Sequence, residues 1–175
     1  MKDLVRLRTS LSEEIEAVLN EQIKLEAKSS SIYLAMAGWC ERNGFDHSAD
    51  FFFKQSDEER MHMLKIFKYI CDMGGKAISP DVAGIEQEFT SFRGIFEDAL
   101  VQEIRVTQSI NNIVDKCHKF KDYTTVGFME WFLKEQREEE FIARRALELF
   151  DVIGEEGVGR YMIDKKIPEL TYSAD

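Results

Sequence analysis

Proline and glycine divide this chain into long uninterrupted segments, and their placement constrains its fold more than any other feature. Pro80 and Pro168 are the only prolines, so two long stretches can form helices without a break. Glycines cluster at Asn43-Gly44, around Pro80 and within 154–159, where helices are expected to end. Between these positions apolar residues recur at the helical period, and no alternating strand pattern is visible. The sequence therefore predicts an all-α protein.

Five helices fit this pattern in a single domain, residues 1–175, which has the usual length of one folding unit. A capping-box sequence, Ser10-Leu11-Ser12-Glu13, is expected to begin the first helix. The expected helices cover about 11–43, 46–73, 92–119, 123–153 and 156–165, with a crossover at 74–91.

The lengths of the connections predict the topology. Short turns near Gly44 and Lys121 join the long helices into two antiparallel hairpins. The crossover of about 18 residues reaches ~60 Å at ~3.3 Å per extended residue. The second helix is only roughly 42 Å long at ~1.5 Å per residue. The crossover can therefore run the whole length of the molecule, which predicts a four-helix bundle with one long crossover and a short fifth helix at the C-terminal end.

Composition excludes several classes of partner. The chain has 33 acidic and 23 basic residues, and its formal charge of −10 argues against nucleic acid and against an anionic membrane surface. Nowhere do about 18 apolar residues run together, so no membrane-spanning helix is expected, and no signal peptide is expected either. Three widely spaced cysteines suit reduced thiols, so the expected location is cytoplasmic.

One glutamate falls on the core-facing apolar stripe of each long expected helix. The four residues are Glu26, Glu59, Glu103 and Glu139. A single glutamate of this kind more often reaches solvent from the edge of the stripe, but four together indicate a polar layer in the core. Glu26 and Glu103 each lie 18 residues before a turn, and Glu139 lies 18 residues after one. The carboxylates of each hairpin are therefore expected to meet within about one turn.

Four ionised carboxylates cannot share a core without compensation, because each unpaired buried charge costs several kcal/mol. No Lys or Arg occupies these stripe positions, so either several carboxyl groups are protonated or cations lie among them. The Glu59-Arg60-Met61-His62 step favours cations, since it puts a carboxylate and an imidazole on one helical face. Oxygen ligands with one imidazole suit iron or manganese; zinc can also bind, and copper is less expected. The lack of inward thiolates argues against an iron–sulfur cluster.

Three segments resemble the signatures of bacterial non-haem ferritins: Leu19–Glu26, Asp57–Met63 and Glu135–Glu140. They occur in the family's order, and the resemblance extends from about Leu19 to Lys166. It implies a ferritin-like fold whose bundle holds a di-iron ferroxidase centre, where Fe(II) is oxidised to Fe(III) by O2 or H2O2. It further implies storage of the iron as ferric mineral inside a homo-oligomeric shell of 24 subunits. Two ferrous ions side by side can deliver two electrons to one oxidant.

The resemblance also implies roles for individual residues. One iron would be bound by Glu26, Glu59 and His62, and the other by Glu59, Glu103 and Glu139, with Glu59 as the bridge and Gln136 beside the second metal. A third iron site would use Glu58, Glu135 and Glu138, although an acidic run at 135–140 can equally be a solvated face. Tyr33 matches a tyrosine beside the centre, which could donate electrons or orient a ligand; a plain core tyrosine is an equal interpretation.

The sequence lacks residues that are typical of bacterioferritins and of other two-iron carboxylate proteins, and this narrows the expected subfamily. Ile142 stands where a second Glu-x-x-His motif would have its histidine, and Arg60 stands where bacterioferritins have a haem-ligating methionine, so no haem is expected. Trp131 is another candidate electron donor, although burial at the edge of the apolar stripe also explains it. Candidates for an iron entry path are Asp115, His118 and Asp122. Two alternatives stay open: a two-iron oxidase or peroxidase that does not store iron, and a structural shell subunit with an idle centre.

Overall fold

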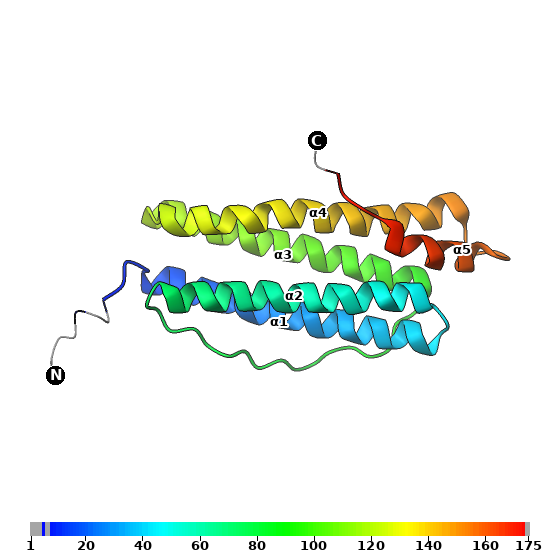
Figure 1. The fold of residues 1–175 in the computed structure, drawn as a ribbon, viewed down its shortest axis with the longest axis horizontal. Helices are drawn as coiled ribbons and strands as arrows, with labels where there is room; N and C mark the ends of the chain where they lie inside the picture. The colour runs from blue at the N-terminus through cyan, green and yellow to red at the C-terminus, as the bar shows by residue number, and fades with distance from the viewer. Residues whose placement is uncertain (1–4, 6–7, 174–175) are drawn as a thin grey trace.

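The computed structural model describes residue 5 and residues 8–173, and these residues form an elongated helical bundle (Figure 1). Its helices are α1 (Glu13–Arg42), α2 (Asp46–Asp72), α3 (Phe92–Phe120), α4 (Tyr123–Ile153) and α5 (Gly159–Lys166), followed by the 3-10 turn η2 (Ile167–Glu169). The described residues contain no strand, so the predicted all-α class is confirmed. Residues 1–4, 6–7 and 174–175 of the expected domain lie outside the described residues. None of the described helices is long and apolar enough to cross a membrane.

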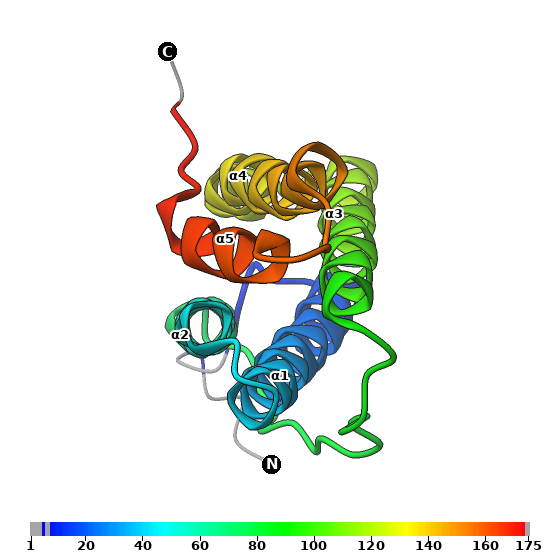
Figure 2. The same cartoon turned by 90° about the vertical axis from the view of Figure 1, so that its right-hand side faces the viewer.

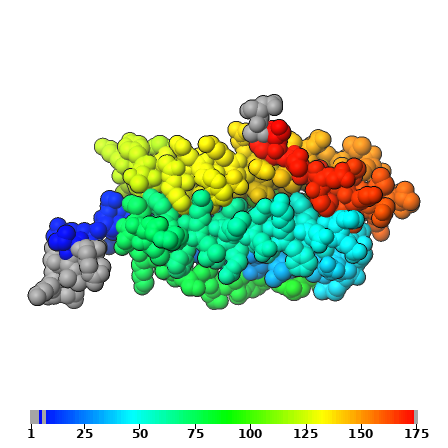
Figure 3. Space-filling model, in the orientation of Figure 1, coloured from blue at the N-terminus to red at the C-terminus, as the bar shows by residue number. Residues whose placement is uncertain are grey.

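The topology is the predicted bundle with one long crossover. The helices α1 and α2 pack as one hairpin, α3 and α4 pack as the other, and α1 also packs against α3. The segment 73–91 runs the length of the bundle between α2 and α3 (Figure 1). Viewed from its end, the bundle has α2 and α4 set apart, with α5 between them (Figure 2). The space-filling view shows this C-terminal segment lying against both helices (Figure 3).

Helix α1 begins at a different serine from the one expected. Its N-cap is Ser12, whose Oγ accepts a hydrogen bond from the N–H of Ile15 at 3.3 Å. Ser10 lies outside the helix because Thr9 holds this segment: its hydroxyl accepts the N–H of Leu11 at 3.0 Å and donates to the carbonyl of Met73 at 2.6 Å. The predicted capping box therefore placed the cap two residues too early.

The fifth helix also begins later than expected. It starts at Gly159 rather than near residue 156, after a turn in which Gly157 has φ 57°. A left-handed backbone at this position interrupts the right-handed helical path. The two hairpin turns use the same conformation, at Gly44 with φ 76° and at Lys121 with φ 57°.

Side chains of α1 hold the crossover against the bundle near both of its ends. Asn20 donates to the carbonyl of Lys76 at 3.0 Å and accepts the N–H of Ile78 at 2.8 Å. At the other end, Arg42 pairs with Glu88 at 3.1 Å. These contacts keep the long connection alongside α1 and leave the space between α2 and α4 to the C-terminal segment.

Two apolar clusters fill the bundle, with a polar layer between them. The cluster near α5 includes Tyr33, Phe52, Phe96 and Phe150, and the opposite cluster includes Ile23, Ile66, Val106 and Phe132. Each long helix contributes one of these residues to each cluster, and the core-facing glutamate of that helix lies between the two in the sequence. The packed side chains on both sides bury the layer, so polar groups inside it depend mainly on one another or on a ligand.

Candidate metal centre

All four core-facing glutamates are buried at the level between the two apolar clusters. Their exposed fractions are 0% for Glu26, 1% for Glu59, 1% for Glu103 and 6% for Glu139. Helical periodicity places them there, because each shares a face with apolar residues three or four positions away. His62, one turn after Glu59 on α2, is also buried, at 3%. The polar layer expected from the sequence therefore exists within the fold.

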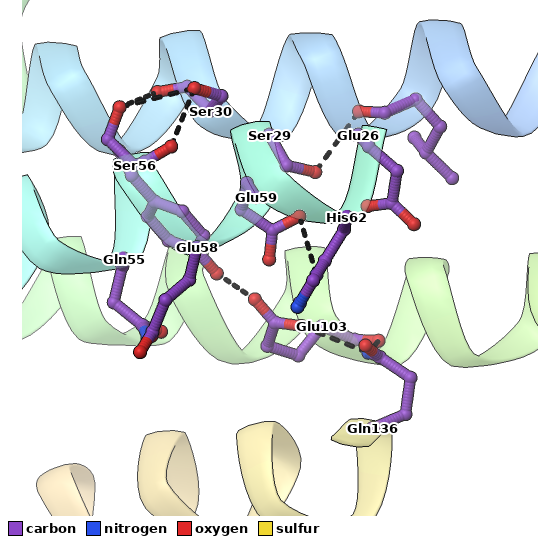
Figure 4. Close-up of polar contacts among 12 residues, drawn as sticks. Glu26, Ser29, Ser30, Gln55, Ser56, Glu58, Glu59, His62, Glu103 and Gln136 are labelled. Carbon is purple, nitrogen blue, oxygen red and sulfur yellow. Dashed lines mark hydrogen bonds and ion pairs between the residues drawn. The ribbon is translucent and has the colours of Figure 1, made fainter. Parts of the chain in front are cut away.

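Glu26, Glu59 and His62 form the most compact part of this layer. One potential ligand atom from each lies within 4.8 Å of the others. Figure 4 shows the three side chains converging from α1 and α2. The Nδ1 atom of His62 is 3.7 Å from Oε2 of Glu59, which is too long for a hydrogen bond. His62 thus faces Glu59 without a hydrogen bond, whereas the carboxyl groups of Glu26 and Glu59 interact with each other.

The layer also contains most of the unpaired buried polar atoms found among the described side chains. Oε2 of Glu26, Oε2 of Glu59, Nδ1 of His62 and Oε2 of Glu139 have no hydrogen-bond partner, and Ser48 Oγ is the one other such atom in the described part of the chain. Leaving a buried polar group unpaired costs about 1–3 kcal/mol, and more for a charged group. A cation bound among these atoms would remove this cost, so the donor set fits metal ions.

Glu103 and Glu139 come from the second hairpin and complete the layer. Glu103 accepts a hydrogen bond from the Tyr33 hydroxyl at Oε1 and one from Gln136 Nε2 at Oε2, the latter at 3.0 Å. Figure 4 shows Glu103 and Gln136 approaching the layer from α3 and α4. Both carboxyl groups are close enough to Glu59 to raise its pKa electrostatically. The two glutamates are nonetheless outside the compact group of three.

Burial shifts the titration of every carboxyl group in the layer. It raises the pKa of Glu26 and Glu59 well above the ordinary value, and the negative charges of neighbouring carboxylates add to this effect. The pKa of Glu139 rises to about 9, because of burial and then the charge of Glu103. Burial also raises the pKa of Glu103, but hydrogen bonds from Tyr33 and Gln136 oppose this rise. Cation binding at such a site displaces protons from the carboxyl groups.

The three residues expected at a third site lie beside the layer, between α2 and α4. Glu58, Glu135 and Glu138 are half-buried and line a cavity of about 250 Å³ that Glu139 also lines. Gln55 donates a hydrogen bond to Oε2 of Glu58 at 2.5 Å. Burial raises the pKa of Glu135 as well. The structure therefore brings these carboxylates together, next to the buried centre rather than within it.

The remaining candidates have other contacts. The ring of Trp131 lies edge-on to His62, with centroids 5.4 Å apart. Asp115 pairs with Lys119 at 2.5 Å, and Asp122 caps α4 by accepting the N–H of Thr125 at 3.0 Å. Within the described part of this chain, Asp115, His118 and Asp122 do not form a compact group of potential ligands.

Comparison with known proteins finds the ferritin-like domain over residues 16–153, most of the chain. The chain belongs to the ferritin family. The helical bundle of this chain is thus the ferritin fold. Ferritin membership was predicted from three short segments of the sequence and is confirmed.

Individual ferritins resemble the chain over nearly its whole length. The bacterial non-heme ferritin of Campylobacter jejuni is 35% identical over 163 residues, which cover 93% of this chain and 98% of that protein. The bacterial non-heme ferritin of Staphylococcus saprophyticus is 37% identical over 162 residues, 93% and 97% of the two chains. A crystal structure of an open pore ferritin from Archaeoglobus fulgidus superimposes with a TM-score of 0.87 at 32% identity, covering 90% of this chain and 96% of that chain.

Sequence reasoning missed two polar residues that contact the layer. Gln22 on α1 is fully buried and donates a hydrogen bond to Glu26 at 2.8 Å. Ser109 on α3 donates a hydrogen bond to Gln22 at 2.5 Å. One signal was available: Gln22 lies four residues before Glu26, one helical turn away on the same face.

Proposed function

We propose that Glu26, Glu59, His62, Glu103 and Glu139 form a di-iron ferroxidase centre inside the bundle. As a ferritin, this chain oxidises Fe(II) and stores the iron. One observation carries the assignment: unpaired polar atoms of Glu26, Glu59, His62 and Glu139 are buried together in the middle of the fold, with Glu103 beside Glu59. Carboxylate oxygens with one imidazole nitrogen are ligands that iron accepts.

Each residue of the centre has a distinct task in this proposal. Glu26 and His62 hold one Fe(II), Glu139 and Glu103 hold the second, and Glu59 lies between the two groups as the bridge. The carboxylates offset the charge of the bound ions and favour Fe(III) over Fe(II), and each Fe(II) supplies one electron to O2 or H2O2. Gln136 and Tyr33 keep Glu103 in place through their hydrogen bonds. The centre has no haem in this proposal.

We further propose a third iron site at Glu58, Glu135 and Glu138. The support is the shared cavity, which places these carboxylates beside Glu139 of the centre. An iron ion leaving the centre toward this cavity meets oxygen ligands at once, and the half-buried carboxylates are accessible enough to release it. Removing Glu138 should therefore change retention of iron more than the first oxidation step.

The proposed assembly is a homo-oligomeric shell of 24 subunits in the cytoplasm. Its support is the resemblance of nearly the whole chain to ferritins. No nucleic acid or membrane partner is part of the proposal. Size measurement during iron loading under air tests the assembly: a large shell that retains iron supports storage. A monomer or dimer that oxidises Fe(II) without retaining it would indicate a non-storing two-iron oxidase instead.

Stopped-flow kinetics test the centre directly. Glu59→Ala and His62→Ala should abolish rapid oxidation of Fe(II), because each removes a ligand, while gel filtration shows an unchanged assembly. Asp57→Ala is a matched control, since Asp57 is an exposed carboxylate on the same helix. Oxidation kinetics that stay unchanged in the two ligand variants would contradict the assignment.

A further inference from the structure

A hydrogen-bonded chain of two side chains ends on one of the proposed ligands. Ser109 on α3 donates its hydroxyl hydrogen to Oε1 of Gln22, at 2.5 Å. Gln22 on α1 in turn donates from Nε2 to Oε1 of Glu26, at 2.8 Å. Gln22 is fully buried, so no water competes for either end of its amide group. The chain therefore connects α3 to a glutamate of the centre through two hydrogen bonds.

The direction of this chain is fixed by charge. An ionised carboxylate, as Glu26 is when it binds a metal, only accepts hydrogen bonds, so the Gln22 amide must then present its NH2 group to Glu26 and its carbonyl oxygen to the other side. A flipped amide would set an oxygen against the carboxylate and leave both oxygens unpaired. The Ser109 hydroxyl is compatible with this orientation, because it donates a hydrogen bond to the carbonyl oxygen of Gln22. Gln22 thus has one favourable orientation.

The two oxygens of Glu26 consequently differ. Oε1 is occupied by Gln22, whereas Oε2 is buried without a hydrogen-bond partner. The Glu26 side chain extends toward Glu59 and His62 (Figure 4). Glu103 is arranged differently, since both of its oxygens accept hydrogen bonds.

We propose that Gln22, held by Ser109, is a positioning residue that makes Glu26 a one-oxygen ligand with Oε2 presented to the metal. The proposal rests on the di-iron centre described above and adds a role for two residues outside it. Without the amide, the Glu26 carboxylate can rotate, and it can bind an ion through both oxygens or turn away from it. Loss of such a partner to a ligand typically costs about 10- to 100-fold in metal affinity or activity.

Binding of Co(II) to the iron-free assembled protein measures this role without any oxidation step. The visible absorption of Co(II) reports both occupancy and the number of ligand atoms around the ion. Gln22→Leu keeps much of the side-chain volume but removes both polar ends, so Co(II) affinity should fall by about 10- to 100-fold, with an altered spectrum. Ser109→Ala should change affinity in the same direction by a smaller factor, and Ser109→Thr, which retains the hydroxyl, should restore it.

Gln102→Leu is the matched control. Gln102 is another buried glutamine, and it donates to Ser29 Oγ at 2.8 Å without contacting the carboxylates of the centre through any hydrogen bond described for it. Gln102→Leu should leave Co(II) binding unchanged, although it should lower thermal stability about as much as Gln22→Leu does. Wild-type affinity and spectrum in Gln22→Leu, or an equal loss in both leucine variants, would overturn the proposal.

Two further results separate the positioning role from the centre itself. If His62→Ala binds Co(II) as the wild type does, the proposed centre is wrong and the positioning role is wrong with it. If His62→Ala loses Co(II) while Gln22→Leu and Ser109→Ala keep it, the centre stands and only the positioning role is refuted. Because Ser109 is half-buried, Ser109→Ala should give a folded variant even where Gln22→Leu does not.

Discussion

Gln136 on α4 donates a hydrogen bond to Oε2 of Glu103 on α3, with a donor–acceptor distance of 3.0 Å. The same nitrogen lies 3.3 Å from the Glu103 carbonyl oxygen and 3.4 Å from Thr107 Oγ1. Both side chains are buried, at 2% and 1% exposure. The contact therefore joins the two helices of the second hairpin at the level of the proposed centre and fixes one carboxylate there.

Gln136→Leu should slow oxidation of Fe(II) by about 10- to 100-fold, because Glu103 then loses the donor that orients it. The measurement is stopped-flow absorbance after mixing with Fe(II) under air. Gln108→Leu serves as the control, since Gln108 is an exposed glutamine on α3. A Gln136→Leu protein that oxidises Fe(II) at the wild-type rate would show that this hydrogen bond only stabilises the fold.

Tyr33→Phe tests the other donor to Glu103. The ring of Tyr33 stacks on Phe52 with centroids 5.9 Å apart, and phenylalanine preserves this packing. Loss of the hydroxyl leaves Oε1 of Glu103 without its donor, which should lower the free energy of unfolding by about 1–3 kcal/mol. Oxidation of Fe(II) should slow as well, because the hydroxyl orients Glu103. Unchanged kinetics with reduced stability would identify Tyr33 as a core residue without a part in the reaction.

The fold and the polar layer could be predicted because both follow from periodicity. One glutamate per apolar stripe, at matching distances from the turns, places Glu26, Glu59, Glu103 and Glu139 in one layer, and the structure buries all four. The long crossover follows from the number of residues after Gly74. Regular helices transmit such spacing faithfully over many residues, since each turn repeats the last.

The parts that could not be predicted depend on contacts between helices. Ser109 and Gln22 are 87 positions apart, and only tertiary packing shows that they bond to each other. The choice of Ser12 over Ser10 as the N-cap depends on Thr9 bonding to Met73, which is also a long-range contact. Side-chain hydrogen bonds of this kind leave no periodic signal in the sequence.

Stability of the metal-free protein should fall as the pH rises from about 4.5 to about 9. Burial raises the pKa of Glu139 from its ordinary 4.5 to about 9, so the folded state keeps a proton that the unfolded state releases in this range. A state that binds more protons loses relative stability when the pH increases. The contribution of Glu139 is therefore full below its unfolded pKa and is lost progressively up to its folded pKa.

Glu139→Gln isolates this effect, because glutamine has a similar shape and does not titrate. Scanning calorimetry of the metal-free proteins should give similar unfolding temperatures near pH 4.5 and an increasing advantage for the variant toward pH 9. Co(II) should reverse the order at high pH, since a cation that binds only the folded wild type stabilises it. A difference between the two proteins that does not depend on pH would contradict a buried, proton-retaining Glu139.

Asp164 links the fifth helix to the start of α2. Its carboxylate accepts the N–H of Ser48 at 2.8 Å and that of His47 at 3.3 Å, while α2 has no side-chain cap of its own. Asp164→Ala should lower the free energy of unfolding by about 1–2 kcal/mol, because it leaves N–H groups at a helix N-terminus without an acceptor. Asp164→Asn keeps one acceptor and should lose less. Urea titration measures both, and oxidation of Fe(II) should be unaffected, since Asp164 contacts α2 eleven residues before Glu59.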